Sequence, residues 1–204
     1  MALMPQQPLH PCLLPVSSRF SSLSLVTNPY DCRLGDAGAE VRMVGHSGQP
    51  VGDILCQTDF SALVQAQGAA AAVSAADLSL QALKATLQWG HLAPTAPDTL
   101  ACYPLTDDDP FVMPALNSKE SSSSSTTDNN DTPHILFAGN QPGFASELVE
   151  GINYRTLLVC VPSFRETGTA VLVNTRTLKA STVSFQLNGG PETDMDTGAA
   201  IDVA

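Results

Sequence analysis

Histidine and carboxylate side chains are the first candidates for chemistry in this 204-residue sequence, because such side chains hold catalytic metal ions. Hydrolysis with two metal ions needs several of these ligands around ions roughly 3.5–4 Å apart. The sequence has only four histidines, widely spaced, at positions 10, 46, 91 and 134. A single imidazole such as that of His46 cannot hold two ions, so the ligand count argues against metal-dependent hydrolysis.

The segment Gly45–Gln49, with the sequence Gly-His-Ser-Gly-Gln, is close to the Gly-x-Ser-x-Gly nucleophile elbow of serine hydrolases. Gln49 stands where the elbow needs its last glycine, and Pro50 and Gly52 predict only a weak helix after it. We therefore interpret the segment as a strand-to-loop turn. Asp107–Asp109 is not interpreted as a cation site, because three consecutive residues of an extended chain cannot all face one ion.

Composition narrows the class of protein. The formal net charge is −11 with only nine lysines and arginines, and binding to a phosphate backbone needs cationic side chains. A DNA role is therefore expected only through partners. We expect no membrane span, because no apolar run approaches the ~20 residues required. The five cysteines form no C-x-x-C pair, which argues against a zinc ribbon or a disulfide framework and favours reduced thiols in the cytosol or nucleus.

The strongest helix prediction covers Ala75–Trp89. Ser74 and Asp77 have the spacing of a capping box, and Gly90 is expected to end the helix. Leu80, Leu83 and Leu87 form one apolar stripe, which we assign to the core. A shorter helix is expected to begin at Pro50, with Val51, Ile54 and Leu55 facing inward.

Apolar runs bounded by turn residues predict six strands. They are Leu23–Thr27, Val41–Val44, His134–Ala138, Thr156–Pro162, Thr169–Thr175 and Thr182–Leu187. A tight turn is expected at Gly139 and Asn140, and another at Arg165–Gly168. Residues 117–132 are of low complexity and cannot bury apolar area, so we expect a disordered insertion there.

Six segments, in order along the chain, resemble one known family. They are Met4–Pro15, Leu25–Tyr30, Val44–Leu55, His91–Pro104, Pro133–Phe144 (PHILFAGNQPGF) and Leu157–Leu178. Together they resemble the small, non-catalytic B subunit of replicative DNA polymerases, a family of inactive calcineurin-like phosphoesterases. The delta type is favoured, and the alpha and epsilon types stay open.

The resemblance implies a mixed α/β fold, namely the C-terminal half of a sandwich of two mixed sheets flanked by helices. Residues 1–22 are expected to form a Pro- and Ser-rich arm, 23–187 the phosphoesterase part and 188–204 a disordered acidic tail. The chain would then be a C-terminal fragment of a longer protein. Half a sandwich exposes faces that the whole fold buries, so we expect the isolated chain to be unstable or to aggregate.

Active members of the wider phosphoesterase family carry Gly-His-x-His at the end of a strand of this kind. This sequence has Gly139, Asn140, Gln141 and Pro142 there. The resemblance makes Asn140, Pro142 and His46 vestigial metal-site positions, with no catalytic residue, metal or cofactor retained. Asn is a poor replacement for an imidazole ligand, and the side chain of Pro has no donor atom.

The family relationship implies a scaffold in the nucleus that acts in DNA replication. Its expected partners are the C-terminal cysteine-rich module of the polymerase catalytic subunit and a third accessory subunit. The alternative is a metal-dependent phosphodiesterase or exonuclease that keeps its activity through replacement ligands.

Overall fold

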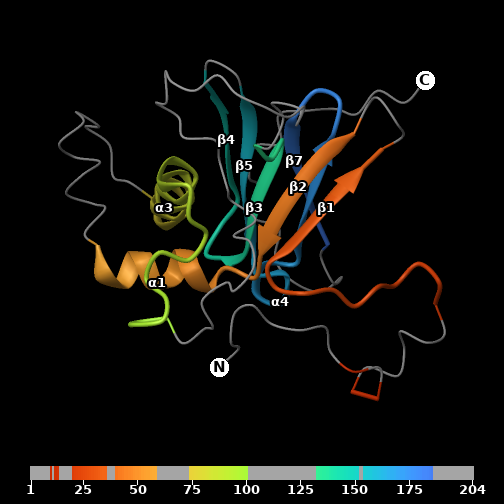
Figure 1. Ribbon diagram of the computed structural model, residues 1–204. Coiled ribbons are helices and arrows are strands. Elements are labelled where there is room, and N and C mark those ends of the chain that lie inside the picture. The colour runs from red at the N-terminus through yellow and green to blue at the C-terminus, as the bar shows by residue number, and fades with distance from the viewer. Residues whose placement is uncertain are drawn as a thin grey trace, which may run out of the picture.

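The computed structural model describes residues 10, 12–13, 20–35, 40–58, 74–100, 132–151 and 154–185 (Figure 1). These residues contain both strands and helices. In order they are β1 (Tyr30–Leu34), β2 (Val41–His46), α1 (Gln49–Gln57), α3 (Ala75–Trp89), β3 (Ile135–Gln141), β4 (Ala145–Glu150), β5 (Arg155–Pro162), α4 (Phe164–Thr167), β6 (Thr169–Asn174) and β7 (Lys179–Ser184).

Five strands form a mixed sheet in the order β1-β2-β3-β5-β4. The three central strands, β2, β3 and β5, are parallel, while β1 and β4 pair antiparallel at the two edges. The central strands are apolar on both faces because both faces are covered. The expectation of a mixed α/β fold is confirmed, and the architecture is consistent with part of a phosphoesterase-like sandwich.

One face of the sheet packs against α3 and α1 (Figure 1). Alternate residues of the strands point to this face, since side chains in a strand alternate with a period of two. The buried apolar residues that meet here are Val44, Val51, Ile54, Leu80, Leu83, Leu87, Leu136, Ala138, Leu158 and Cys160. This layer is the main core, and it fixes the loops at the ends of β2 and β3 over the helices.

The opposite face carries the hairpin β6–β7, a separate two-stranded sheet that lies behind the main sheet in Figure 1. Ile135, Leu157 and Val159 project to this side and pack with Val171 and Val173 of β6. The structure therefore has three layers, with helices, a mixed sheet and a hairpin in that order.

The helix predictions are confirmed. α3 spans Ala75–Trp89, its capping box joins Ser74 and Asp77, and Gly90 ends it in a left-handed conformation. The apolar stripe is buried. Pro50 lies in the first turn of α1, whose Val51 and Ile54 are buried while Leu55 is half-buried.

Three strand predictions need correction. Residues 23–27 form no strand. Leu23 and Val26 are 40% exposed, so these apolar residues do not mark a buried strand. The last strand is β7 at Lys179–Ser184, not Thr182–Leu187, because the preceding turn at 175–178 sets the hairpin register. The strand expected to stop at Ala138 continues to Gln141, with a register shift in place of the tight turn.

Two strands, β1 and β4, were not predicted. The segment expected to turn at Arg165–Gly168 is the one-turn helix α4, which ends at Gly168 in a left-handed conformation. The predicted insertion at 117–131, the tail at 188–204 and most of the arm at 1–22 lie outside the described residues, so the proposed domain division stays a prediction.

Candidate functional site

The carboxyl ends of β2 and β3 meet at one edge of the sheet. The two strands are parallel, and His46 at the end of β2 pairs with Ala138 of β3. The loop after β2 and the last residues of β3 therefore lie side by side. Ligand sites of α/β sheets form at this edge, so it is the candidate functional site.

His46 is buried beneath this edge, with 3% of its surface exposed. Its Nδ1 accepts a hydrogen bond from the backbone N–H of Gly48 at 3.0 Å. Burial lowers the pKa of His46 to about 4, so the imidazole is neutral at pH 7 and its proton sits on Nε2. The Nε2 atom is buried and has no hydrogen-bond partner.

Ser47 follows His46 and belongs to a network of side-chain amides. Asn28 Nδ2 donates to Ser47 Oγ at 2.6 Å, and the Ser47 N–H donates to Asn28 Oδ1 at 3.1 Å. The Ser47 hydroxyl also bonds to Gln49 Oε1. A nucleophilic serine needs a base such as imidazole on its hydroxyl. Amides occupy that position here, so the arrangement supports the turn interpretation of this segment.

Asn140 closes the site from the β3 side. Its backbone is left-handed, with φ at 52°, and its Nδ2 donates to the carbonyl oxygen of Ser47 at 3.1 Å. Gln141 is buried and donates from Nε2 to the carbonyl oxygen of Gly139 at 2.8 Å. The Asn140 amide therefore joins the two loops, whereas the Gln141 amide bonds within the end of β3.

A hollow of about 660 Å³ opens beside this edge, between α1, α3 and the β3–β4 turn. Asn140, Gln141 and Pro142 line it, together with Cys56 and Gln57 of α1. The structure thus brings Asn140 and Pro142, two positions predicted to be vestigial, to one cavity, while His46 lies beneath it and is not part of its lining.

The donor atoms of this site do not fit a pair of catalytic metal ions. Such ions require several carboxylates and neutral imidazoles. The residues around the hollow supply amides, two hydroxyls and a thiol, and the described residues contain no group of three or more His, Cys, Asp or Glu that could hold an ion. No step of a metal-assisted reaction can be derived from them.

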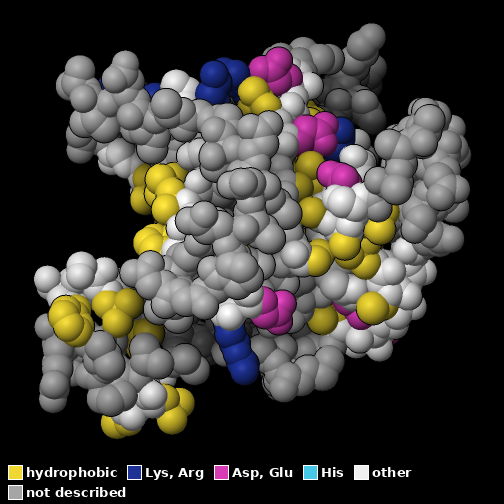
Figure 2. All heavy atoms as spheres, turned by 180° about the vertical axis from the view of Figure 1, so that it is seen from behind, with side chains coloured by type: hydrophobic (Ala, Val, Ile, Leu, Met, Phe, Trp, Pro, Cys, Tyr) yellow, Lys and Arg dark blue, Asp and Glu magenta, His cyan; other side chains and the backbone are white. Residues whose placement is uncertain are grey.

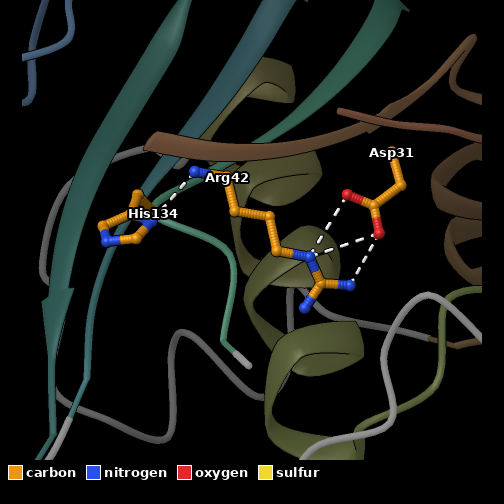
Figure 3. Close-up of polar contacts among 3 residues, drawn as sticks. All are labelled: Asp31, Arg42 and His134. Carbon is orange, nitrogen blue, oxygen red and sulfur yellow. Dashed lines mark hydrogen bonds and ion pairs between the residues drawn. The ribbon is translucent and has the colours of Figure 1, made fainter. Parts of the chain in front are cut away.

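The other histidines lie elsewhere. His134 precedes β3, at the amino end of that strand, and its Nδ1 accepts from the backbone N–H of Arg42 at 3.1 Å (Figure 3). Burial, followed by the charges of Arg33 and Arg42, lowers the pKa of His134. His91 bonds to Ala93 in the turn after α3. Asp107–Asp109 lies outside the described residues.

Two of the polar contacts that the sequence reasoning missed involve β1 or the segment just before it. One is the hydrogen bond from Asn28 to Ser47, which could not be predicted because the two residues are 19 positions apart in the sequence. The other is the ion pair between Arg42 of β2 and Asp31 of β1, with N–O distances of 2.7 to 3.2 Å (Figure 3). The Arg42 side chain is 10% exposed, so this pair fixes the edge strand to the sheet.

Comparison with known proteins defines the family. The family model for the B subunit of DNA polymerases alpha and epsilon matches residues 1–146, which is more than half of the chain. The chain therefore belongs to this B-subunit family of DNA polymerases.

Within that family the chain is similar to the small subunits of DNA polymerase delta. It is 40% identical over 187 residues to DNA polymerase delta subunit 2 of Drosophila melanogaster, covering 91% of this chain and 35% of the relative. The delta small subunits of Oryza sativa subsp. japonica and Saccharomyces cerevisiae are 34% and 31% identical, over 89% and 90% of this chain and 34% and 37% of theirs. The chain thus spans about a third of the length of these relatives, and its delta-type resemblance is confirmed.

Proposed function

We propose that the chain is part of a non-catalytic scaffold subunit of a delta-type replicative DNA polymerase. It docks the C-terminal cysteine-rich module of the catalytic subunit and bridges it to a third accessory subunit in the nucleus. Family membership supports the polymerase assignment, and the carboxyl edge of the sheet supports the non-catalytic role.

The observation that carries the non-catalytic role is the bond from Asn140 to the Ser47 carbonyl. The resemblance to active phosphoesterases places an imidazole ligand at this position. Here an amide occupies it and ties two loops of the same chain together. Pro142 lines the hollow without a side-chain donor atom. Neither side chain supplies an imidazole or a carboxylate that could hold a catalytic metal ion.

Co-expression with the C-terminal module of the delta catalytic subunit from the same organism tests the scaffold role. We expect the chain and the module to elute together from a sizing column at 150 mM salt, and the Asn140→Ala variant to elute in the same complex. Separate elution of the wild-type chain and the module, both folded by circular dichroism, would contradict the proposal.

Hydrolysis of a generic phosphodiester with Mn²⁺ tests the rival enzymatic role. We expect no turnover above a metal blank. Turnover by the wild-type chain that Asn140→Ala abolishes would establish a phosphodiesterase with replacement ligands, and the scaffold interpretation of this edge would then be wrong.

A further inference from the structure

The hairpin β6–β7 carries apolar residues on both of its faces. Directly opposed residues of two antiparallel strands share a face. The pairs of Ala170 with Val183 and of Leu172 with Ser181 therefore lie on one face of the hairpin, its outer face. The inner residues Val171, Val173 and Ala180 pack against the main sheet. A strand with apolar residues at consecutive positions is typical of burial on both sides.

The outer face of the hairpin reaches the surface. Leu172 is 52% exposed, Phe185 is 60% exposed and Phe164 of α4 is 57% exposed. The rings of Phe164 and Phe185 meet edge to face, with centroids 5.9 Å apart. Figure 2 views the molecule from behind, and hydrophobic side chains reach the surface in separate groups on that side. Exposed aromatic and aliphatic groups gathered in this way mark interaction surfaces.

Basic residues lie at both ends of this outer face. Arg165 follows Phe164 at the end next to α4, and Arg176 and Lys179 stand at the tip of the hairpin. Glu166 is the single acidic residue between positions 164 and 185. This segment is therefore net positive in a chain whose formal net charge is −11.

We infer that this outer face, formed by Phe164, Leu172, Lys179 and Phe185, docks an amphipathic helix with acidic residues in its first and last turns. Strands of six residues span about 20 Å, which a helix of about 13 residues matches in length. The apolar stripe of such a helix covers Leu172 and the two phenylalanines. Its acidic ends meet Arg165 at one end and Arg176 and Lys179 at the other, which fixes the helix lengthwise.

The inference rests on the hairpin alone and does not require the proposed polymerase partner. Its test uses two labelled synthetic helical peptides of 14 residues with the same leucine stripe. One carries Glu in its end turns and the other Lys. Fluorescence anisotropy with the full chain is expected to give a Kd for the Glu peptide at least about tenfold lower than for the Lys peptide.

Variants locate the binding surface. Leu172→Asp is expected to raise the Kd of the Glu peptide at least about tenfold, because it places an acid in the apolar centre. Lys179→Glu should weaken the Glu peptide and strengthen the Lys peptide. Trp89→Asp on α3, where the Trp side chain is 55% exposed, is the matched control and should change neither.

Three results would overturn the inference. Equal affinity for the two peptides would show that the basic residues do not select an acidic helix. Binding that is insensitive to Leu172→Asp would show that the peptide binds elsewhere. A discrete dimer in sedimentation velocity that Leu172→Asp dissociates would show that a second copy of the chain covers this face.

Discussion

Gly48 and Asn140 both have left-handed backbone conformations, with φ angles of 101° and 52°. A Cβ atom at Gly48 would collide with the carbonyl oxygen of Gly139, so a side chain there would push the β2 and β3 loops apart. Asparagine is among the non-glycine residues that tolerate this backbone region best. Backbone geometry and close packing thus account for the residue types at this edge.

The buried imidazole of His46 makes stability depend on pH. Its pKa is lowered to about 4 in the fold, whereas an unfolded chain binds the proton near pH 6.5. The free energy of unfolding that the neutral His46 imidazole contributes is complete above pH 6.5 and declines as the pH falls towards 4. The expected loss is about 3 kcal/mol of unfolding free energy between these limits. Urea unfolding at pH 7.5, 6, 5 and 4.5 measures it.

His46→Gln removes the titrating group and should flatten this part of the pH dependence, leaving a smaller decline in the same direction from His134, whose pKa is also lowered. His10→Gln changes an exposed imidazole and serves as the control. An unchanged pH slope in His46→Gln would mean that folding does not lower the pKa of His46.

The resemblance to active phosphoesterases pointed to Asn140, Pro142 and His46, because Gly-Asn-Gln-Pro stands where those enzymes carry Gly-His-x-His and His46 falls near an earlier histidine ligand of theirs. It could not show that Asn140 bonds to Ser47, since that contact spans 93 residues. It also could not show that His46 lies beneath the hollow and outside its lining, because that depends on how the two loops stack.

Among the elements, the edge strand β1 is joined to β2 by an antiparallel ladder and by the ion pair of Asp31 with Arg42. Asp31→Ala removes the carboxylate that accepts from the nearly buried Arg42 guanidinium and is expected to cost about 2 kcal/mol of unfolding free energy. Amide hydrogen exchange should quicken in β1 and remain slow in β3 and β5. Chemical denaturation and exchange on the full chain measure the two effects.

The pair between Arg33 and Glu40 provides a matched control. It joins residues close to the same two strands at 3.5 Å, but the side chains are 59% and 44% exposed. Exposed pairs contribute little, so Glu40→Ala should cost less than about 1 kcal/mol. Equal losses for Asp31→Ala and Glu40→Ala would show that burial of Arg42 does not set the strength of its pair.

Some elements could be predicted from the sequence and others could not, and the burial of their residues explains the difference. α3 has a capping box, an apolar stripe and a terminal glycine, so its bounds were predicted correctly. β1 and β4 are edge strands with mostly half-buried or exposed residues, so no clear alternation marks them. The register of β7 follows from the turn at 175–178, where Asn174 Oδ1 accepts from the backbone N–H groups of Arg176 and Thr177.

For the molecule as a whole, the charge predicts that DNA is not a direct ligand. The described residues carry acidic and basic groups in nearly equal number, and the complete chain has a net charge of −11. At 150 mM salt we expect no saturable binding of a labelled primer–template by the chain alone, with any Kd above about 100 μM. Fluorescence anisotropy at 50 and 150 mM salt measures this.

Tight binding that falls steeply with salt would contradict the expectation. The basic residues near the hairpin would then be its source, and Lys179→Glu would be expected to abolish it. Salt-insensitive binding would point to base stacking on Phe164 and Phe185 instead.

The pairing of β2 with β3 joins Met43 to Ile135, residues 92 positions apart, and this has a consequence for biosynthesis. A ribosome adds about 5–20 residues per second, so β2 emerges roughly 5–20 s before the strand beside it exists. Until then the side of β2 that pairs with β3 has no native partner. The central sheet can therefore nucleate only after most of the polypeptide has left the exit tunnel. Nascent chains halted before residue 135 should therefore engage chaperones, whereas those extended beyond β5 should release them.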